Sequence, residues 1–327
     1  MGIIKERRKL NKAIRNAKNI FLMAHKNLDL DALGSQIGMY MILKKKKKNC
    51  FIIIDDKEHE AGVEKVLREL DGVMNRIKSS EIEEYMDSRQ SKNLLIILDT
   101  NKTELVQSKE VLNKIDKKIV IDHHDLGKTT IKNAEIIDDS KVSSTCEMIT
   151  SLIEFYDVEL DSYYATILLS GIVLDTNNYT LNTSAETYYS SYYLASLGAS
   201  AKKVQYLLKQ DINEYTERQK LMADIETIDD KIAFTRASAN TIYRREDLAK
   251  VADTLLFFNN IEASFVIGKI GKDTIGVSAR SLGNYDIGKI LTKLGGGGDN
   301  NAGAATKENT TLAKVEQELK KILKEGE

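Results

Sequence analysis

The sequence contains no proline, no tryptophan and only two cysteines, Cys50 and Cys146, among its 327 residues. Two isolated cysteines offer neither a disulfide framework nor a CxxC metal site, so a small disulfide-stabilised fold is excluded and a reducing compartment is expected. Average usage would give roughly 16 prolines in a chain of this length. Their absence indicates a strong source bias or an altered sequence, so the proline positions of any known motif hold other residues here.

The chain also lacks a long apolar run and an excess of charge of one sign. No segment approaches the ~20 apolar residues that a membrane helix needs, and the charged amino terminus lacks the apolar core of a signal peptide. Lysine and arginine number 48 against 49 acidic residues, which argues against the broad basic surface of a duplex nucleic-acid binder. We therefore expect a cytoplasmic protein that holds any anionic substrate locally.

Short apolar segments alternate with helical patterns in the first half of the chain, which predicts βαβ units and a parallel sheet with helices on both faces. A smaller α/β unit follows, so we expect an α/β protein with an active-site cleft between two domains. The predicted parts are a catalytic domain over 1–190, a helical connector over 191–228 and a substrate-binding domain over 229–327. The predicted elements include strands at 19–24, 51–54, 93–98, 118–121 and 134–137, and a helix at 214–228.

Histidines and aspartates follow or lie within several of the apolar segments. The carboxyl ends of parallel strands meet at one edge of a sheet, so we expect these side chains to converge there. Each of them alone has a structural alternative, such as capping a helix, and the hypothesis therefore depends on their joint pattern. The residues are His25, Asp29, Asp31, Asp99, Asp122, His123, His124 and Asp175.

Five carboxylates in one small pocket repel one another unless bound cations offset their charge. Imidazole and carboxylate ligands without thiolates suit Mn²⁺, Fe²⁺ or Mg²⁺ and disfavour a structural zinc site of the cysteine type. The number of ligands exceeds the needs of one ion. Two cations bridged by a carboxylate form the arrangement that phosphoester hydrolysis uses, so the residues predict a two-metal phosphohydrolase.

A run of four glycines, 295–298, lies directly before Asp299. Glycines let backbone N–H groups approach a phosphate closely, although a glycine-rich helix terminator would also explain the run. Arg280, at the end of a predicted strand, supplies a guanidinium that can hold a phosphate through two hydrogen bonds. These residues predict a substrate-binding lobe.

Five segments of the chain resemble the DHH phosphoesterases that carry a C-terminal DHH-associated domain. The resemblance covers essentially the full length and rests on segments 24–34, 98–100, 120–124, 171–176 and the glycine run. Segments 143–147, 252–256, 263–267 and 278–283 are more similar to the cyclic-di-AMP phosphodiesterases than to the nanoRNA and pAp phosphatases of the same family. The resemblance implies Mn²⁺-dependent hydrolysis of cyclic di-AMP to linear pApA, with Mg²⁺ or Fe²⁺ as alternative metals.

The resemblance also implies a role for each site residue. The expected metal ligands are His25 and Asp29 for the first ion, Asp31, His123 and Asp175 for the second, and Asp99 for both. Asp122 is expected to orient a histidine, and His124 to contact phosphate or protonate the leaving group. The expected substrate contacts are Ser144, Arg280, Gly296, Gly297, Gly298 and Asp299.

Two positions depart from the family pattern. Leu28 replaces a proline, a change that should not affect metal binding. Asp299 stands where the family has a substrate-binding histidine, and its carboxylate is expected to weaken phosphate binding while metal binding stays intact. The alternatives are therefore a short-RNA exonuclease or pAp phosphatase, and a catalytically weakened nucleotide sensor. By resemblance we also expect a homodimer, either a standalone enzyme or the cytoplasmic catalytic part of a membrane-anchored protein.

Overall fold

The computed structural model describes residues 2–55, 59–238 and 240–324. The chain divides into two compact units, Met1–Lys209 and Gln210–Glu327. Both units combine helices with a six-stranded sheet, which confirms the predicted α/β class. The division falls within the predicted connector, whose role as a separate element stays a prediction. Among the described helices, none combines the length and the apolar character needed to cross a membrane.

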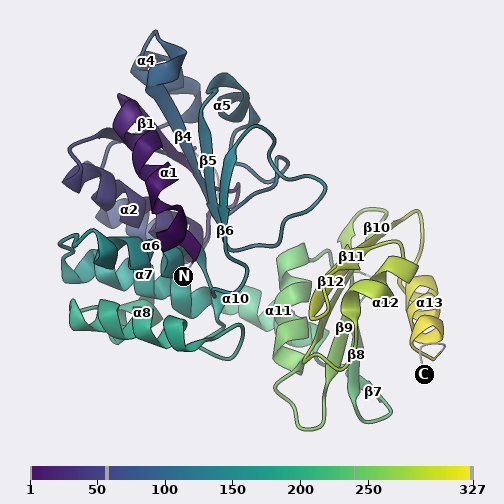
Figure 1. The fold of residues 1–327 in the computed structure, drawn as a ribbon. Helices are drawn as coiled ribbons and strands as arrows, with labels where there is room; N and C mark the ends of the chain where they lie inside the picture. Colours follow the sequence, from purple (N-terminus) through teal and green to yellow (C-terminus); the bar gives the residue numbers. More distant parts are fainter. Residues whose placement is uncertain (1, 56–58, 239, 325–327) are drawn as a thin grey trace. The chain divides into compact units, whose positions relative to one another are not determined.

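A parallel sheet with strand order β3-β2-β1-β4-β5-β6 forms the centre of the first unit (Figure 1). Its strands are β1 (Asn19–Met23), β2 (Asn49–Ile53), β3 (Arg76–Ile77), β4 (Asn93–Leu98), β5 (Lys118–Asp122) and β6 (Glu135–Asp138). Every neighbouring pair is parallel. The strand order reverses between β1 and β4, and open α/β sheets bind their ligands at the carboxyl ends of the strands beside such a reversal.

Apolar side chains cover both faces of this sheet. Successive residues of a strand point to opposite faces, so Ile20 and Leu22 join one apolar cluster while Phe21 and Met23 join the other. This explains why β1 and β4 are apolar throughout. The apolar cluster on the first face includes residues of α1 (Gly2–Asn16), α2 (Leu30–Lys45), α3 (Ala61–Glu69), α6 (Thr145–Phe155), α7 (Ser162–Asp175), α8 (Ala185–Ser196) and α9 (Ala201–Leu207), of which α8 and α9 pack on other helices. The second face packs against α4 (Ile82–Tyr85) and α5 (Lys109–Lys114).

Helix α1 was absent from the sequence-based prediction. Its Ile3, Leu10 and Ile14 are buried in the first cluster, and its charged residues face outward or lie at the edge of the contact. Spacings of seven and four residues place these three side chains on one helical face. The pattern could have indicated the helix, but the density of charge around it obscured it.

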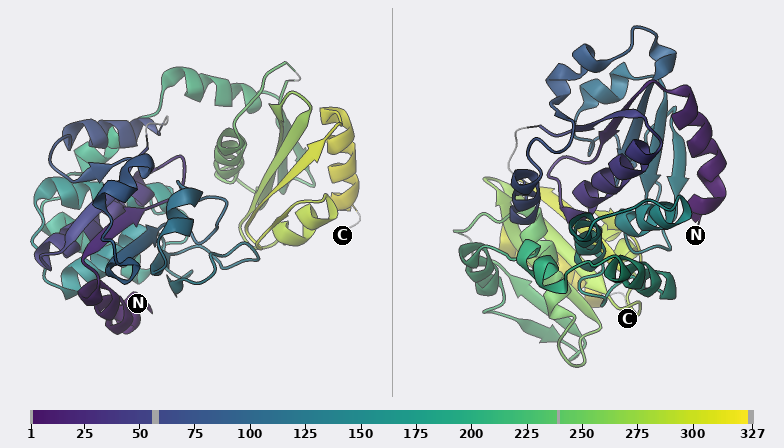
Figure 2. Two further views of the ribbon diagram at one scale, coloured as in Figure 1. Left: turned by 90° about the horizontal axis from the view of Figure 1, so that it is seen from above. Right: turned by 90° about the vertical axis from the view of Figure 1, so that its left-hand side faces the viewer.

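The second unit contains a mixed sheet with strand order β11-β12-β10-β9-β8-β7. Its strands are β7 (Glu226–Ile228), β8 (Ile232–Arg236), β9 (Ala263–Gly271), β10 (Thr274–Ser281), β11 (Gly297–Gly298) and β12 (Ala302–Glu308). Strands β8 and β9 pair in parallel, and the other neighbours pair antiparallel. One face packs against α11 (Arg245–Leu255) and the other against α12 (Ile287–Lys293) and α13 (Leu312–Lys324), as the left view of Figure 2 shows.

The predicted helix over 214–228 is wrong at its carboxyl end. Helix α10 covers Ile212–Leu221, and Glu226–Ile228 instead forms β7, which pairs with β8. Residues 229–231 join the two strands, and the φ angles of Asp229 and Asp230, 50° and 56°, are those of a tight hairpin turn. The two adjacent aspartates are a turn signal that ends the helical pattern.

Candidate metal centre

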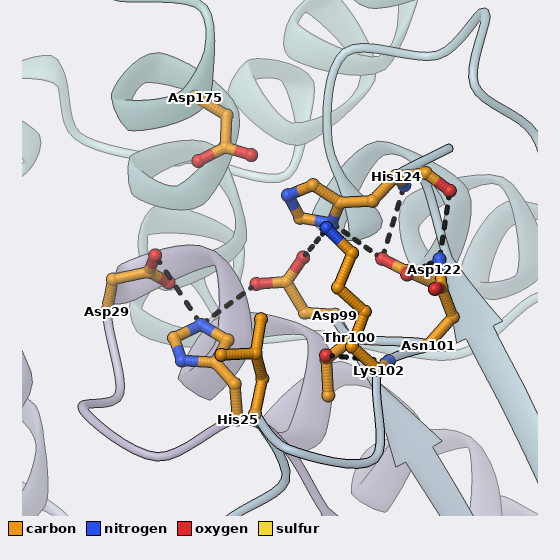
Figure 3. Close-up of a pocket in the computed structure, with 10 residues that line it drawn as sticks. His25, Asp29, Asp99, Thr100, Asn101, Lys102, Asp122, His124 and Asp175 are labelled. Carbon is orange, nitrogen blue, oxygen red and sulfur yellow. Dashed lines mark hydrogen bonds and ion pairs between the residues drawn. The ribbon is translucent and has the colours of Figure 1, made fainter. Parts of the chain in front are cut away.

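The eight histidines and aspartates predicted for the site gather at the carboxyl edge of the first unit's sheet. His25 follows β1, Asp99 follows β4, and Asp122 ends β5 directly before the two adjacent histidines. Helices supply the others. Asp29 precedes α2, Asp31 lies in its first turn, and Asp175 ends α7. Figure 3 shows several of these side chains around one pocket.

Asp99 lies between two histidines that belong to different strand ends. Its Oδ2 is 3.3 Å from His25 Nε2, and its Oδ1 is 3.5 Å from His123 Nε2. The hydroxyl of Thr145 also donates a hydrogen bond to Oδ1, at 3.0 Å. The φ angle of Asp99 is 59°, an uncommon value for a residue other than glycine, and such strained residues cluster at functional sites. Oδ2 of this carboxylate therefore faces His25, whereas Oδ1 faces His123 and also lies 3.8 Å from His124 Nδ1.

The first group of candidate ligands contains His25, Asp29 and Asp99. His25 Nε2 lies 3.6 Å from Asp29 Oδ2, and the other ring nitrogen, Nδ1, is 2.8 Å from the carbonyl oxygen of Lys26. A backbone contact at Nδ1 fixes the ring and leaves Nε2 free to bind a metal. The second oxygen of Asp29, Oδ1, accepts hydrogen bonds from Asp31 N–H and Ala32 N–H, which begins helix α2.

The second group contains Asp31, His123 and Asp175. His123 Nε2 is 3.1 Å from Asp175 Oδ2, yet this buried nitrogen has no hydrogen-bond partner among the described residues. A buried nitrogen without a partner is costly unless it binds something else. Asp31 is fully buried, and its two oxygens accept hydrogen bonds from Thr145 N–H and Cys146 N–H at the start of α6.

The donors in both groups suit a divalent metal. In each group, one candidate ligand atom from every residue lies within 4.8 Å of the others. All of these atoms are imidazole nitrogens or carboxylate oxygens, the donors that Mn²⁺ and Fe²⁺ favour. Together with the orphaned Nε2 of His123, this donor set fits one or more bound cations.

Burial and mutual repulsion disfavour the ionised form of three carboxyl groups in the centre. Burial and the nearby charge of Asp31 raise the pKa of Asp99 well above its ordinary value, and burial and Asp29 do the same to Asp175. Burial and Asp175 raise the pKa of Asp31 to about 6. Burial opposes the charged form of His25, but hydrogen bonds to Asp29 and Asp99 outweigh it and raise the pKa of the ring to about 12. A bound cation would reverse this proton uptake.

His124 forms a third possible ligand group with Asp99 and His123, and its Nδ1 is 3.8 Å from Asp99 Oδ1. Its Nδ1 is 2.8 Å from Asp122 Oδ1, and its side chain is about half exposed, at 52%. Asn101, which the sequence analysis missed, donates from Nδ2 to Asp122 Oδ2 at 2.6 Å and to the carbonyl oxygen of His124 at 3.0 Å. The arrangement fixes one histidine ring at the mouth of the pocket.

Three further residues near the centre were not identified from the sequence. Thr100, Asn101 and Lys102 follow Asp99 directly and line the pocket beside it (Figure 3). Their position immediately after a strand-end aspartate was the signal available. Polar residues of a loop carry no periodicity, so the sequence could not show which of them face inward.

The predicted substrate contact Ser144 is fully buried in the first unit. Its hydroxyl accepts a hydrogen bond from Glu147 N–H and caps α6. Arg280 lies in the second unit, where its Nε is 2.7 Å from Asp253 Oδ1 and one terminal nitrogen donates to the carbonyl oxygen of Ala279 at 3.0 Å. Capping explains Ser144 without a ligand, and substrate contact by either residue stays a prediction.

The glycine run has a structural explanation in the second unit. Gly297 and Gly298 form β11, which pairs with Ala304 and Gly303 of β12. A side chain at Gly296 or Gly298 would collide with backbone atoms of β12. Asp299 follows in the turn, and its Oδ1 accepts hydrogen bonds from Asn301 N–H at 2.7 Å and Ala302 N–H at 2.8 Å. Contact of this hairpin with phosphate stays a prediction.

Comparisons with known proteins identify the class. Residues 19–172 match the DHH family, N-terminal domain, and residues 229–325 match the DHHA1 domain. The chain therefore belongs to the DHH family and carries its DHHA1 domain, as the sequence motifs indicated.

Two curated relatives of this chain are named cyclic-di-AMP phosphodiesterases. The chain is 33% identical over 318 residues to the cyclic-di-AMP phosphodiesterase GdpP of Geobacillus thermodenitrificans, covering 96% of this chain and 48% of that protein. It is 33% identical over 314 residues to the cyclic-di-AMP phosphodiesterase PdeA of Listeria monocytogenes, covering 95% of this chain and 48% of that protein. The chain thus spans about half the length of these curated relatives.

Solved structures share the fold. An exopolyphosphatase-related protein from Bacteroides fragilis aligns with a TM-score of 0.78 at 20% identity, over 97% of this chain and 95% of that one. RecJ from Thermus thermophilus, solved in complex with Mn²⁺, aligns with a TM-score of 0.54 at 15% identity, over 99% of this chain and 55% of that one. At these identities the likeness concerns the fold alone.

Proposed function

We propose that this protein is a two-metal phosphodiesterase that hydrolyses cyclic di-AMP to linear pApA, with Mn²⁺ as its metal. The observation that carries the proposal is the position of Asp99, whose two carboxylate oxygens face His25 and His123. A carboxylate placed in this way suits a bridge between two ions. The relatives named cyclic-di-AMP phosphodiesterases favour this substrate.

The first unit supplies the metal ligands in this proposal. His25 and Asp29 would hold one ion, Asp31, His123 and Asp175 would hold the other, and Asp99 would contact both. When bound, such cations would supply an activated water and would offset the charge on the phosphoryl oxygens. The backbone N–H groups of Thr145 and Cys146 orient the carboxylate of Asp31 from behind.

His124 acts on the leaving group. Its ring is exposed at the pocket and fixed by Asp122 through Nδ1, so Nε2 is available to donate a proton to the departing ribose oxygen. Asp122 does not contact substrate in this scheme. Its function is to hold Nδ1–H of His124 in a hydrogen bond, so that the second proton of the imidazolium lies on Nε2 and can pass to the leaving group.

A second candidate is hydrolysis of short oligoribonucleotides or pAp. The chain is 26% identical over 313 residues to the bifunctional oligoribonuclease and PAP phosphatase NrnA of Thermus thermophilus, covering 94% of this chain and 89% of that protein. The predicted metal centre would serve either reaction. The chain is less identical to NrnA than to the cyclic-di-AMP phosphodiesterases, so short RNA and pAp are the second choice of substrate.

Product analysis separates the two candidates. Purified protein is incubated with cyclic di-AMP, pApA or pAp at matched concentrations of Mn²⁺, and the products are resolved by chromatography. We expect pApA from cyclic di-AMP as the fastest reaction; faster release of AMP from pAp would contradict the proposal.

Two variants test the assignment of the centre. Asp99→Ala should abolish turnover, because it removes the bridging carboxylate. Asp138→Ala is the matched control, since Asp138 also ends a strand of the same sheet but is exposed. Turnover by Asp99→Ala at the wild-type rate would refute the assignment.

A further inference from the structure

Lys102 is the one lysine or arginine among the described residues that line the metal pocket. Its side chain extends into the pocket from the loop that follows β4 (Figure 3). No carboxylate of the described residues forms an ion pair with its ammonium, whereas many exposed lysines of this chain do form such pairs. A partly buried, unpaired cation beside a cluster of acids needs an explanation.

The backbone of Lys102 is held in place on both sides. Its N–H donates to Thr100 Oγ1 at 3.3 Å, and the residue forms an isolated antiparallel bridge with Thr130. Two further backbone bonds flank the bridge, from Ile131 N–H to Asn101 O at 2.7 Å and from Thr103 N–H to Thr129 O at 3.1 Å. These bonds tie the Lys102 loop to the loop that begins with His123 and His124.

The sum of charges around the pocket indicates that the ammonium of Lys102 would offset the charge of a bound phosphodiester. Five ionised carboxylates, those of Asp29, Asp31, Asp99, Asp122 and Asp175, exceed the charge of two divalent cations by one. A phosphodiester brings a further negative charge into this pocket. A protonated His124 would offset the first of these charges, but the charge of the phosphodiester would remain, and a fixed ammonium in the lining would offset it.

We propose that Lys102 is a substrate-binding residue whose ammonium contacts a non-bridging phosphate oxygen of the phosphodiester held at the metal centre. The inference rests on the proposed function, and it adds a phosphate contact supplied by the same unit as the metal ligands. Lysine serves as a point charge for phosphate and does not require the planar geometry of arginine. The ligand class is a phosphodiester or phosphate monoester bound beside the metals.

The test compares Lys102→Met with Lys102→Arg and with a matched control, Lys128→Met. Lys128 lies on the bridged loop that follows His124, is exposed and does not line the pocket. The Lys102→Met variant should raise the KM for cyclic di-AMP about tenfold to a hundredfold, the usual range for a lost charge-assisted hydrogen bond. Lys102→Arg should recover most of this loss, and Lys128→Met should match the wild type.

A second readout does not depend on the identity of the substrate. Inorganic phosphate is titrated calorimetrically into the Mn²⁺-loaded proteins, and its Kd should rise at least about tenfold in Lys102→Met. If the wild type does not hydrolyse cyclic di-AMP but phosphate binding still depends on Lys102, the proposed function fails and the phosphate contact stands.

Three results would overturn the phosphate contact. The first is a wild-type Kd for phosphate in Lys102→Met. The second is an equal loss of phosphate affinity in Lys128→Met, which would mean that the total positive charge of the two loops, and not a contact of Lys102, determines phosphate binding. The third is loss of Mn²⁺ affinity in Lys102→Met, measured in the absence of phosphate, which would mean that the lysine acts on the metal site itself.

Discussion

The Nδ1 atom of His124 lies 2.8 Å from Oδ1 of Asp122, and Asp122 is fully buried. Burial alone would raise the pKa of Asp122, but the hydrogen bond and charge of His124 outweigh it and lower the pKa below its ordinary value. The ionised aspartate thus fixes the orientation of a histidine that is itself half exposed. The two adjacent histidines thus differ in their contacts, since His123 Nε2 lies 3.1 Å from Asp175 and His124 Nδ1 is bound to Asp122.

Asp122→Asn should slow turnover while leaving metal binding intact. The amide removes the negative charge behind His124, and loss of such an orienting partner typically costs about 10-fold to 100-fold in activity. Steady-state kinetics give the effect on kcat, and calorimetry gives the affinity for Mn²⁺. Asp125→Asn, at an exposed neighbouring position, is the control. A large loss of Mn²⁺ affinity in Asp122→Asn would mean that Asp122 is itself a ligand.

Affinity for Mn²⁺ should fall as the pH falls through about 6. Burial and Asp175 raise the pKa of Asp31 to about 6, so a proton competes with the metal below that pH. Asp31 alone weakens binding about fourfold between pH 7.5 and pH 5.5, and the raised pKa values of His25, Asp99 and Asp175 add to this loss. Titration in two buffers of different ionisation enthalpy counts the protons released. Binding that is independent of pH, without proton release, would contradict the assignment.

Gly171→Ala should damage both stability and metal binding. A Cβ at Gly171 would lie 2.6 Å from Cys146 Sγ and 2.9 Å from the Cα of Asp31. Overpacking of this kind costs about 1–3 kcal/mol of the free energy of unfolding, and here it would also displace a candidate ligand. Denaturant unfolding and Mn²⁺ titration measure the two effects. Gly127→Ala is the control, because a Cβ there meets nothing within 4 Å; equal behaviour of the two variants would show that the contact is unimportant.

Asp299→His should lower the KM for cyclic di-AMP. The substitution removes a carboxylate expected to repel phosphate and restores the histidine of the family pattern. Asp299 also accepts two backbone hydrogen bonds in the turn before β12, so Asp299→Asn is the informative companion. Asparagine keeps an oxygen for the turn while removing the charge. An unchanged KM in both variants would show that the charge of Asp299 does not affect substrate binding.

The position of histidines and aspartates directly after apolar segments predicted the parallel sheet of the first unit and the edge at which these side chains meet. His25 and Asp99 each follow an apolar strand, and parallel strands place such residues at one edge. Lys102 and Asn101 could not be identified in this way, since their positions depend on a bridge to a loop almost thirty residues away. Strand β12, with the sequence AGAATKE, was missed because alanine and glycine carry little strand signal.

The number of Mn²⁺ ions bound per chain tests the central claim most directly. Metal-free protein is titrated with Mn²⁺ and the stoichiometry is read by calorimetry. We predict two ions in the wild type and the loss of at least one in Asp99→Ala, because that carboxylate faces both ligand groups. A single ion in the wild type, held equally well by Asp99→Ala, would contradict the two-metal account.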